Sequence, residues 1–429
     1  MRIPTALLVV LLLAACAGDR ASTPPSGTPP PMLGVVWDYD GESSFVARLD
    51  PRSLEPLPGP RAPLGRADGP RAFSPDGSRV VFAGSGAIRV LDLERMRVLA
   101  DVPAQGDFGA VAWPEPRGVL LATGFNWEIG VEAVVVDPLA RRVLSRRSLG
   151  GSLQRFAPTD DGLLLLLGPR AGGIGPARLA LLSADGSMPV LRLDSITAGF
   201  EQEELEGGSV VDHYRTPGLA VDPTGERAFV VTAADLVAEV DLRTLDVDYR
   251  ELREPASLRG RLHNWLEPAA EAKGASDGSL RSAVWLGDGL LAVSGFDDHA
   301  SFGDEGNQTQ TTEPAGVTLV DTRTWSRRML EPDATEVSIA GELLLVWNWE
   351  TVAFEGAGLS AFDRAGERRF RLFEREPLAD VQVVGRRAYV TFDDSSSCQG
   401  RIVDLQAGRV LGGTDLRNLC DRSLLSPDG

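Results

Sequence analysis

The chain has 429 residues, enough for a large core or for two or three domains of ordinary size. Its hydrophobic fraction of 43% and charged fraction of 24% are typical of a globular protein. The formal net charge is −18 and the basic residues form no cluster. This balance argues against binding to nucleic acid and against docking of the folded surface on anionic lipid.

The first fifteen residues have the features of an export signal. The charged side chain of Arg2 precedes an apolar run, Ala6 to Ala15, that is too short for a bilayer, which needs about 20 residues. Leu13-Ala14-Ala15-Cys16 resembles the lipobox of bacterial lipoproteins. The resemblance implies that residues 1–15 are a signal peptide and that Cys16 carries the lipids. An ordinary signal peptide followed by a chance cysteine is the alternative.

Residues 16–31 follow as a short tether. The stretch AGDRASTPPSGTPPP offers almost nothing to bury and is rich in Pro, Ser and Thr. Such a segment holds a folded domain away from a membrane. We therefore expect an exported protein, lipid-anchored at the cell membrane or outer membrane, with its body outside the cytoplasm.

One unit recurs through residues 32–429, so the body is one domain. Its clearest copies run from Arg71 to Leu99 and from Gly218 to Leu252. Each contains four short runs rich in Val, Leu and Ala, which Gly, Asp and Pro separate, as in strands joined by tight turns. A period of about 40–50 residues predicts a β-propeller or a solenoid.

The two ends of the chain complete each other. The C-terminal SLLSPDG, Ser423 to Gly429, repeats the S-P-D-G of Ser74 to Gly77 with no strand after it, whereas the unit that begins at Leu33 lacks a first strand. The S-P-D-G and V-D-x-x-T units resemble the WD40-like, YVTN and TolB-type propeller repeats of bacterial envelope proteins. The resemblance implies a ring closed by pairing of the two ends. Counting first strands predicts eight four-stranded blades, with seven as the alternative.

An Asp recurs at the turn between the third and fourth strands of each unit. We expect its carboxylate to accept backbone N–H groups of the turn, so its role is structural. The eight positions are Asp50, Asp92, Asp137, Asp185, Asp241, Asp321, Asp363 and Asp404.

Three long segments should open on one face, around adjacent blades. They are Ser195 to Pro217, Arg253 to Gly278 and Phe296 to Gly316, and the second includes a possible short helix. They carry many carboxylates, which suits a cationic ligand, a protein partner or Ca²⁺, although a solvated acidic loop is the default interpretation. The candidate ligand or partner face comprises Glu201, Glu204, Asp212, His213, Asp297, Asp298, His299, Asp304 and Glu305.

All three histidines, His213, His263 and His299, fall in these segments. A transition metal would need imidazoles close to a carboxylate, and no ligand spacing indicates such a site. A surface or hydrogen-bonded histidine is therefore the default interpretation, and the identity of any metal stays open.

Cys398 and Cys420 remain after Cys16 is assigned to the lipid anchor. They should lie on the same face of neighbouring blades. Because an exported protein meets an oxidising compartment, we expect a disulfide between them.

Two functional hypotheses remain. The first is a non-catalytic, lipid-anchored propeller that binds a protein or small ligand of the cell envelope through its acidic face. The second is a metal-dependent hydrolase or lactonase of the propeller type, with Ca²⁺ as its metal. The sequence contains no G-x-S-x-G, H-E-x-x-H or C-x-x-C motif, so the first hypothesis is favoured and no catalytic residue is assigned.

Overall fold

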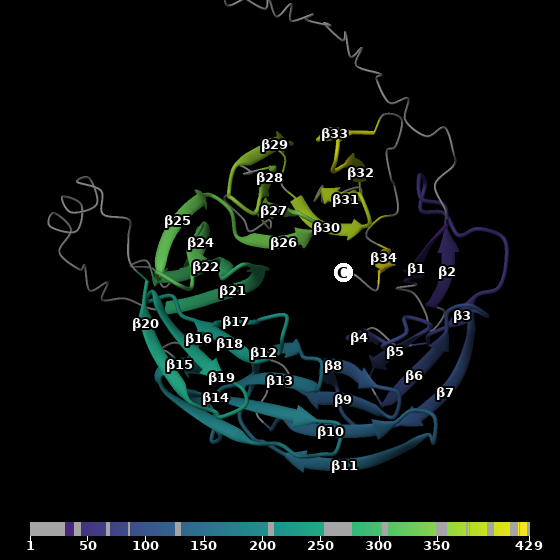
Figure 1. Ribbon diagram of the computed structural model, residues 1–429, viewed down its shortest axis with the longest axis horizontal. Helices are drawn as coiled ribbons and strands as arrows, with labels where there is room; N and C mark the ends of the chain where they lie inside the picture. The colour runs from purple at the N-terminus through teal and green to yellow at the C-terminus, as the bar shows by residue number, and fades with distance from the viewer. Residues whose placement is uncertain are drawn as a thin grey trace, which may run out of the picture.

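The computed structural model describes residues 31–37, 44–65, 69–84, 86–124, 130–204, 210–252, 277–302, 308–348, 358–374, 376, 378–392, 399–411, 419 and 421–426. These residues form sheets that are antiparallel except for one parallel pair of strands, arranged as a ring, the β-propeller that the repeat predicted (Figure 1). The described part of the chain contains no helix, and therefore none long and apolar enough to cross a membrane.

Six sheets are separate four-stranded blades. From the innermost strand outward, the first three are β34 (Arg422–Leu425), β1 (Met32–Val36), β2 (Phe45–Leu49) and β3 (Ala62–Pro63); β4 (Arg71–Phe73), β5 (Arg79–Gly84), β6 (Ala87–Asp92) and β7 (Arg97–Pro103); and β8 (Phe108–Glu115), β9 (Gly118–Thr123), β10 (Glu132–Asp137) and β11 (Arg142–Ser148).

The other three separate blades follow the same order. They are β17 (Gly218–Val221), β18 (Arg227–Val231), β19 (Leu236–Asp241) and β20 (Val247–Glu251); β26 (Glu336–Ala340), β27 (Leu343–Trp347), β28 (Leu359–Asp363) and β29 (Arg368–Leu372); and β30 (Leu378–Val384), β31 (Arg387–Phe392), β32 (Gln399–Asp404) and β33 (Arg409–Val410).

The seventh sheet has ten strands. It joins two repeat units that lie on either side of the β17–β20 blade in the sequence. Its strands are β12 (Leu153–Pro158), β13 (Gly162–Leu167), β14 (Gly173–Ser183), β15 (Val190–Glu204), β16 (Val210–Thr216), β21 (Asp277–Gly287), β22 (Leu290–Phe302), β23 (Gln308–Pro314), β24 (Val317–Asp321) and β25 (Ser326–Glu331).

The prediction of eight separate blades, or seven, is therefore wrong. The described residues form six separate blades, because β16 pairs with β15 on one side and in parallel with β21 on the other, which merges two repeat units into one sheet. Periodicity in the sequence counts repeat units, but it does not report hydrogen bonds between them.

The predicted closure of the ring is confirmed. The C-terminal strand β34 pairs antiparallel with β1, with Leu33 opposite Leu425 and Val36 opposite Arg422. β34 is the innermost strand of this blade and lies beside the centre of the ring (Figure 1). The seam removes an exposed sheet edge, which would otherwise favour aggregation.

The hydrophobic core is distributed around the ring. Eight clusters of buried side chains lie between neighbouring four-stranded units, because alternate residues of each strand face one neighbour or the other. At the seam, Leu425 packs with Val35 and Phe82, whereas Leu424 packs with Tyr389 on the other side. Each unit is therefore held by the two beside it.

The recurring Asp residues have the predicted structural role. For example, Oδ1 of Asp241 accepts the backbone N–H of Arg243 at 2.8 Å and that of Thr244 at 2.9 Å. Equivalent bonds to backbone N–H groups occur at Asp50, Asp92, Asp137, Asp185, Asp321, Asp363 and Asp404. These turns fix the outermost strand of each unit.

Candidate functional site

Two strand ribbons meet where the ten-stranded sheet merges its two repeat units. β15 and β16 form the first ribbon, and β22 and β23 form the second. β21 lies between them, parallel to β16 and antiparallel to β22. We call these five strands the bridge.

The bridge corrects the expectation that residues 195–217 and 296–316 are loops. Most of their described residues are in strands. Their polar sequences lack the alternation of apolar and polar residues that marks a half-buried strand. These strands form through backbone pairing within and between the ribbons and bury little apolar surface. The sequence pattern therefore does not predict them.

The candidate carboxylates on the first ribbon do not form one cluster. Glu201 is opposite His213, and Gln202 is opposite Asp212. Successive residues of a strand point to opposite faces, so Glu201 and His213 share one face while Glu204 and Asp212 share the other. The acidic character is therefore divided between the two faces of the ribbon.

Side-chain contacts on this ribbon are local. Nε2 of His213 lies 3.0 Å from Oε2 of Glu203, and Gln202 donates its amide hydrogen to Oδ1 of Asp212 at 2.9 Å. Glu201 and Glu204 are exposed. Exposed carboxylates on both faces make the ribbon accessible to a cationic group in solution.

Asp298 is buried, and its hydrogen bonds tie the two ribbons together. Tyr214 donates its hydroxyl hydrogen to Oδ2 of Asp298, and Thr312 donates to Oδ1 at 2.5 Å. Tyr214 reaches Asp298 across Gly278, where an added Cβ would clash with the Tyr214 ring. Burial raises the pKa of Tyr214, and the hydrogen bond to Asp298 raises it further. The phenol therefore stays protonated and acts as the donor. These contacts fix the geometry of the bridge.

Asp297 points to the other face and pairs with Arg281. Nη2 of Arg281 lies 2.8 Å from Oδ2 of Asp297, and Nη1 donates to the carbonyl oxygen of Phe296 at 2.9 Å. The Arg281 side chain is only 10% exposed. A buried guanidinium with these partners is a rigid polar group that a ligand can approach.

The histidines do not meet. His213 is on β16 and His299 is on β22, with β21 between them. Two strand spacings place their backbones roughly 10 Å apart. Among the described residues there is no group of three His, Cys, Asp or Glu side chains that could hold a metal ion. His263, Asp304, Glu305, Cys16, Cys398 and Cys420 lie outside the described residues.

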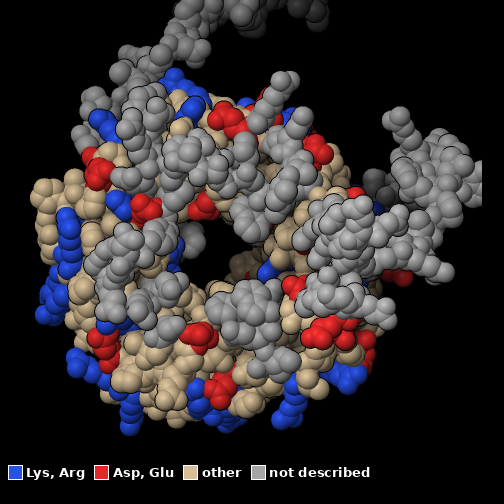
Figure 2. Space-filling view, turned by 180° about the vertical axis from the view of Figure 1, so that it is seen from behind, with Lys and Arg blue, Asp and Glu red and all other residues tan. Residues whose placement is uncertain are grey.

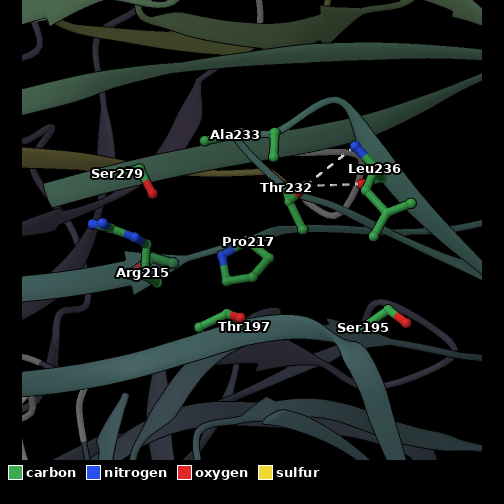
Figure 3. A pocket seen from close by; sticks show the side chains of 10 residues that line it. Ser195, Thr197, Arg215, Pro217, Thr232, Ala233, Leu236 and Ser279 are labelled. Carbon is green, nitrogen blue, oxygen red and sulfur yellow. Dashed lines mark hydrogen bonds between the residues drawn. The ribbon is translucent and has the colours of Figure 1, made fainter. Parts of the chain in front are cut away.

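Two cavities adjoin the bridge. The first, about 260 Å³, lies between the first ribbon and the β18–β19 turn, with Ser195 and Thr197 facing Thr232 and Ala233 across Pro217 (Figure 3). The second, about 250 Å³, is lined by both members of the Arg281–Asp297 pair and by Ser294. Thr232 and Ala233 line both cavities, so the two are neighbours.

The hydroxyl of Ser294 is a polar group in the wall of the second cavity. Ser294 is only 1% exposed, and its Oγ has no hydrogen-bond partner in the described part of the chain. An unsatisfied buried hydroxyl costs roughly 1–3 kcal/mol. The wall of this cavity therefore contains a group that would gain from an additional partner.

A second polar region lies at the centre of the ring. Figure 2 shows an open passage there, with basic and acidic side chains around its edge. The innermost strands contribute Arg71 on β4, Arg155 on β12, Glu336 on β26 and Asp380 on β30. We call these four residues the axial charges.

The axial charges influence one another. Burial raises the pKa of the Glu336 carboxyl to about 7, whereas Arg155 lowers it and Asp380 raises it further. Burial also lowers the pKa values of the Arg71 and Arg155 guanidinium groups. The ring thus brings cationic and anionic groups together around the passage, with Arg71 and Asp380 exposed and Arg155 and Glu336 half-buried.

Sequence reasoning missed the axial charges, although a signal was present. Six first-strand runs have a charged residue at their first or second position: RAFSPDG, QRFAPTDDG, RSAVWLGDG, TEVSIAGE, ADVQVVGR and RSLLSPDG. Because first strands line the axis of a propeller, a repeated charge there predicts a polar passage.

No protein-family model matches the sequence, and no curated protein matches it. Among solved structures, the chain is similar to dihydro-heme d1 dehydrogenase NirN in complex with DHE, with a TM-score of 0.57 and 15% identity over 94% of this chain and 76% of that chain. This likeness supports the fold alone.

Two further structures are similar more weakly. BamB from Moraxella catarrhalis gives a TM-score of 0.45 and 14% identity, covering 83% of this chain and 92% of that chain. Apo AztD from Citrobacter koseri gives a TM-score of 0.48 and 11% identity, covering 90% of this chain and 97% of that chain. Neither likeness is strong enough to indicate a function for this chain.

Proposed function

We propose that this β-propeller is a non-catalytic binding protein of the cell envelope, and that the bridge binds a small cationic ligand. The observation that carries the proposal is the pair of adjoining cavities beside a ribbon of exposed carboxylates. Ligand sites are concave, with few polar groups that converge on the ligand. Both cavities share Thr232 and Ala233, so one ligand of modest size can reach both.

The charges around the first ribbon favour a cation. Glu201, Glu203 and Glu204 are exposed on β15, and Asp212 of β16 lies on the same face as Glu204. The nearby arginines of the second cavity are already paired, Arg281 with Asp297 and Arg327 with Asp235. Arg215 is the basic side chain that lines the first cavity, and the exposed carboxylates outnumber it, so the local potential attracts a cation.

Titration with spermidine tests this function. Isothermal titration calorimetry on the folded protein should detect binding at low ionic strength. The triple variant E201Q/E203Q/E204Q should bind at least tenfold more weakly. Ala233→Trp, which places a large side chain where the cavities adjoin, should also weaken binding.

A matched control distinguishes a site from general attraction to an acidic protein. E94Q/E342Q/E367Q removes the same charge from exposed glutamates elsewhere on the ring. It should change the affinity by less than about twofold. Equal losses in the two triple variants, or no binding to the unaltered protein, would refute the proposal.

The lipid anchor and its tether are part of the same proposal. Lipidation of Cys16 would hold residues 32–429 near a membrane, with residues 16–31 as the spacer. Labelled palmitate should enter the protein in its native host, and Cys16→Ala should abolish both labelling and membrane retention. Labelling that survives this substitution would contradict the anchor.

The pairing of Cys398 with Cys420 also remains a proposal. Residues next to both cysteines, Gln399 and Asp421, belong to neighbouring units that meet near the seam. Peptide mapping without reduction should recover a linked pair. Recovery of two free thiols from oxidised, folded protein would contradict it.

A further inference from the structure

A cavity of about 500 Å³ opens where the first strands of three successive units end. We call it the turn-side cavity. Phe73, Trp113 and Phe156 contribute aromatic surface, and Pro75, Pro114 and Pro158 line it beside them. All lie near turns that join first to second strands, so the cavity opens on the face opposite the bridge.

The aromatic wall includes an unusually exposed side chain. Phe156 is 39% exposed although it lies on an innermost strand. Phe73 is half-buried and Trp113 is 5% exposed. A large apolar side chain exposed in a concave place gains free energy when a second apolar surface covers it.

Arg71 is the cation of this cavity. Its Nη1 donates to Oγ of Ser423 at 2.6 Å, and its Nη2 donates to the carbonyl oxygen of Leu424 at 3.0 Å. These are neutral acceptors, and Arg71 forms no ion pair within the described ranges. A guanidinium has five N–H donors in a planar fork, so donors remain for a further acceptor.

The surroundings of Arg71 make an anion favourable. Burial lowers the pKa of its guanidinium, and the nearest compensating charge is Asp380 on another innermost strand. The Arg71 side chain is exposed, so its remaining N–H donors are accessible to a ligand. A carboxylate can accept two parallel N–H groups from one guanidinium.

We infer that the turn-side cavity binds an aromatic carboxylate. The ring system of the ligand lies against Phe73 and Phe156, and its carboxylate accepts hydrogen bonds from Arg71. The volume accommodates one or two fused rings, and the aromatic wall favours flat surfaces by stacking. This site is separate from the bridge and would take a ligand of opposite charge.

Calorimetric titration with 2-naphthoate and with the neutral 2-naphthalenemethanol tests the inference on the folded protein. The carboxylate should bind at least tenfold more tightly than the alcohol. Arg71→Met should remove that preference, whereas Arg142→Met, which removes an exposed arginine from the outer strand β11, should leave it unchanged.

A second variant keeps the test informative if loss of Arg71 unfolds the seam. Phe156→Ala lies away from β34 and removes half-exposed aromatic surface, so it should weaken 2-naphthoate at least fivefold. Ile339→Ala, in the cavity on the other side of Arg71, is its control and should have little effect. Equal binding of the two probes, or a 2-naphthoate affinity unaffected by Phe156→Ala, would overturn the inference.

Discussion

The hydroxyl of Tyr214 on β16 donates to the buried carboxylate of Asp298 on β22, two strands away. Gly278 on the intervening strand β21 makes the contact possible, because its missing side chain leaves room for the phenol ring. This contact adds a side-chain link to the pairing of β16 with β21, which merges the two repeat units. It assigns a structural role to Asp298, which the sequence had suggested as a ligand-binding residue.

Tyr214→Phe should lower the free energy of unfolding by roughly 1–3 kcal/mol, because Asp298 stays buried and keeps only its bond from Thr312. Urea denaturation measures the change. Tyr249→Phe is the control, since Tyr249 is 37% exposed and its hydroxyl makes only a long contact of 3.5 Å with the Ser195 amide. Equal effects of the two substitutions would contradict the role of the bridge contact.

Asp241→Ala should destabilise the β19–β20 turn, because two backbone N–H groups lose their acceptor. These bonds lower the pKa of the Asp241 carboxyl, and the bond from the Thr244 amide has the largest effect. Its contribution to stability is therefore present above the unfolded-state pKa and is lost as pH falls through the folded one. Titration of the Asp241 carboxyl by NMR should show a pKa below that of Asp in an unstructured peptide. An ordinary pKa would exclude the bonds in solution.

The sequence was sufficient to predict the repeat, the turn Asp residues and the pairing of β34 with β1, because each depends on local patterns or matching strand fragments. It was insufficient for the bridge. The parallel pairing of Tyr214 with Gly278 joins polar strands about 60 residues apart through backbone bonds, which leave no side-chain period. The axial charges were visible as residues, but their meeting depends on ring closure, which brings Arg71 beside Ser423.

Glu336 should make stability depend on pH in a known direction. Because burial raises its folded pKa to about 7, its protonated form is favoured in the folded state. The loss of folding stability caused by ionising Glu336 is absent below the unfolded pKa of about 4.5. It grows as pH rises toward 7 and then stays constant. The facing charges are Arg155, which lowers the pKa, and Asp380, which raises it.

Glu336→Gln should therefore gain stability relative to the parent between pH 5 and 8, by at most about 3 kcal/mol for a shift of this size. Denaturation midpoints of both proteins at each pH give the difference. Glu342→Gln, which alters an 82% exposed glutamate in the same blade, should show no such trend. A difference that is flat with pH would show that Glu336 titrates normally.

The closing seam should govern the stability of the whole ring. Deleting residues 419–429 removes β34, exposes the edge of β1 and takes Leu424 and Leu425 out of two inter-unit clusters. It also removes both acceptors of the Arg71 guanidinium. We expect a large drop in the melting temperature together with concentration-dependent aggregation, because an unpaired edge strand can pair with another chain.

Leu425→Ala, which leaves the backbone pairing intact, should cost roughly 2–5 kcal/mol through its buried side chain. Leu144→Ala, at a side chain 45% exposed on β11, should cost far less. A truncated protein that melts like the full chain and stays monomeric would show that the seam does not close the ring in solution.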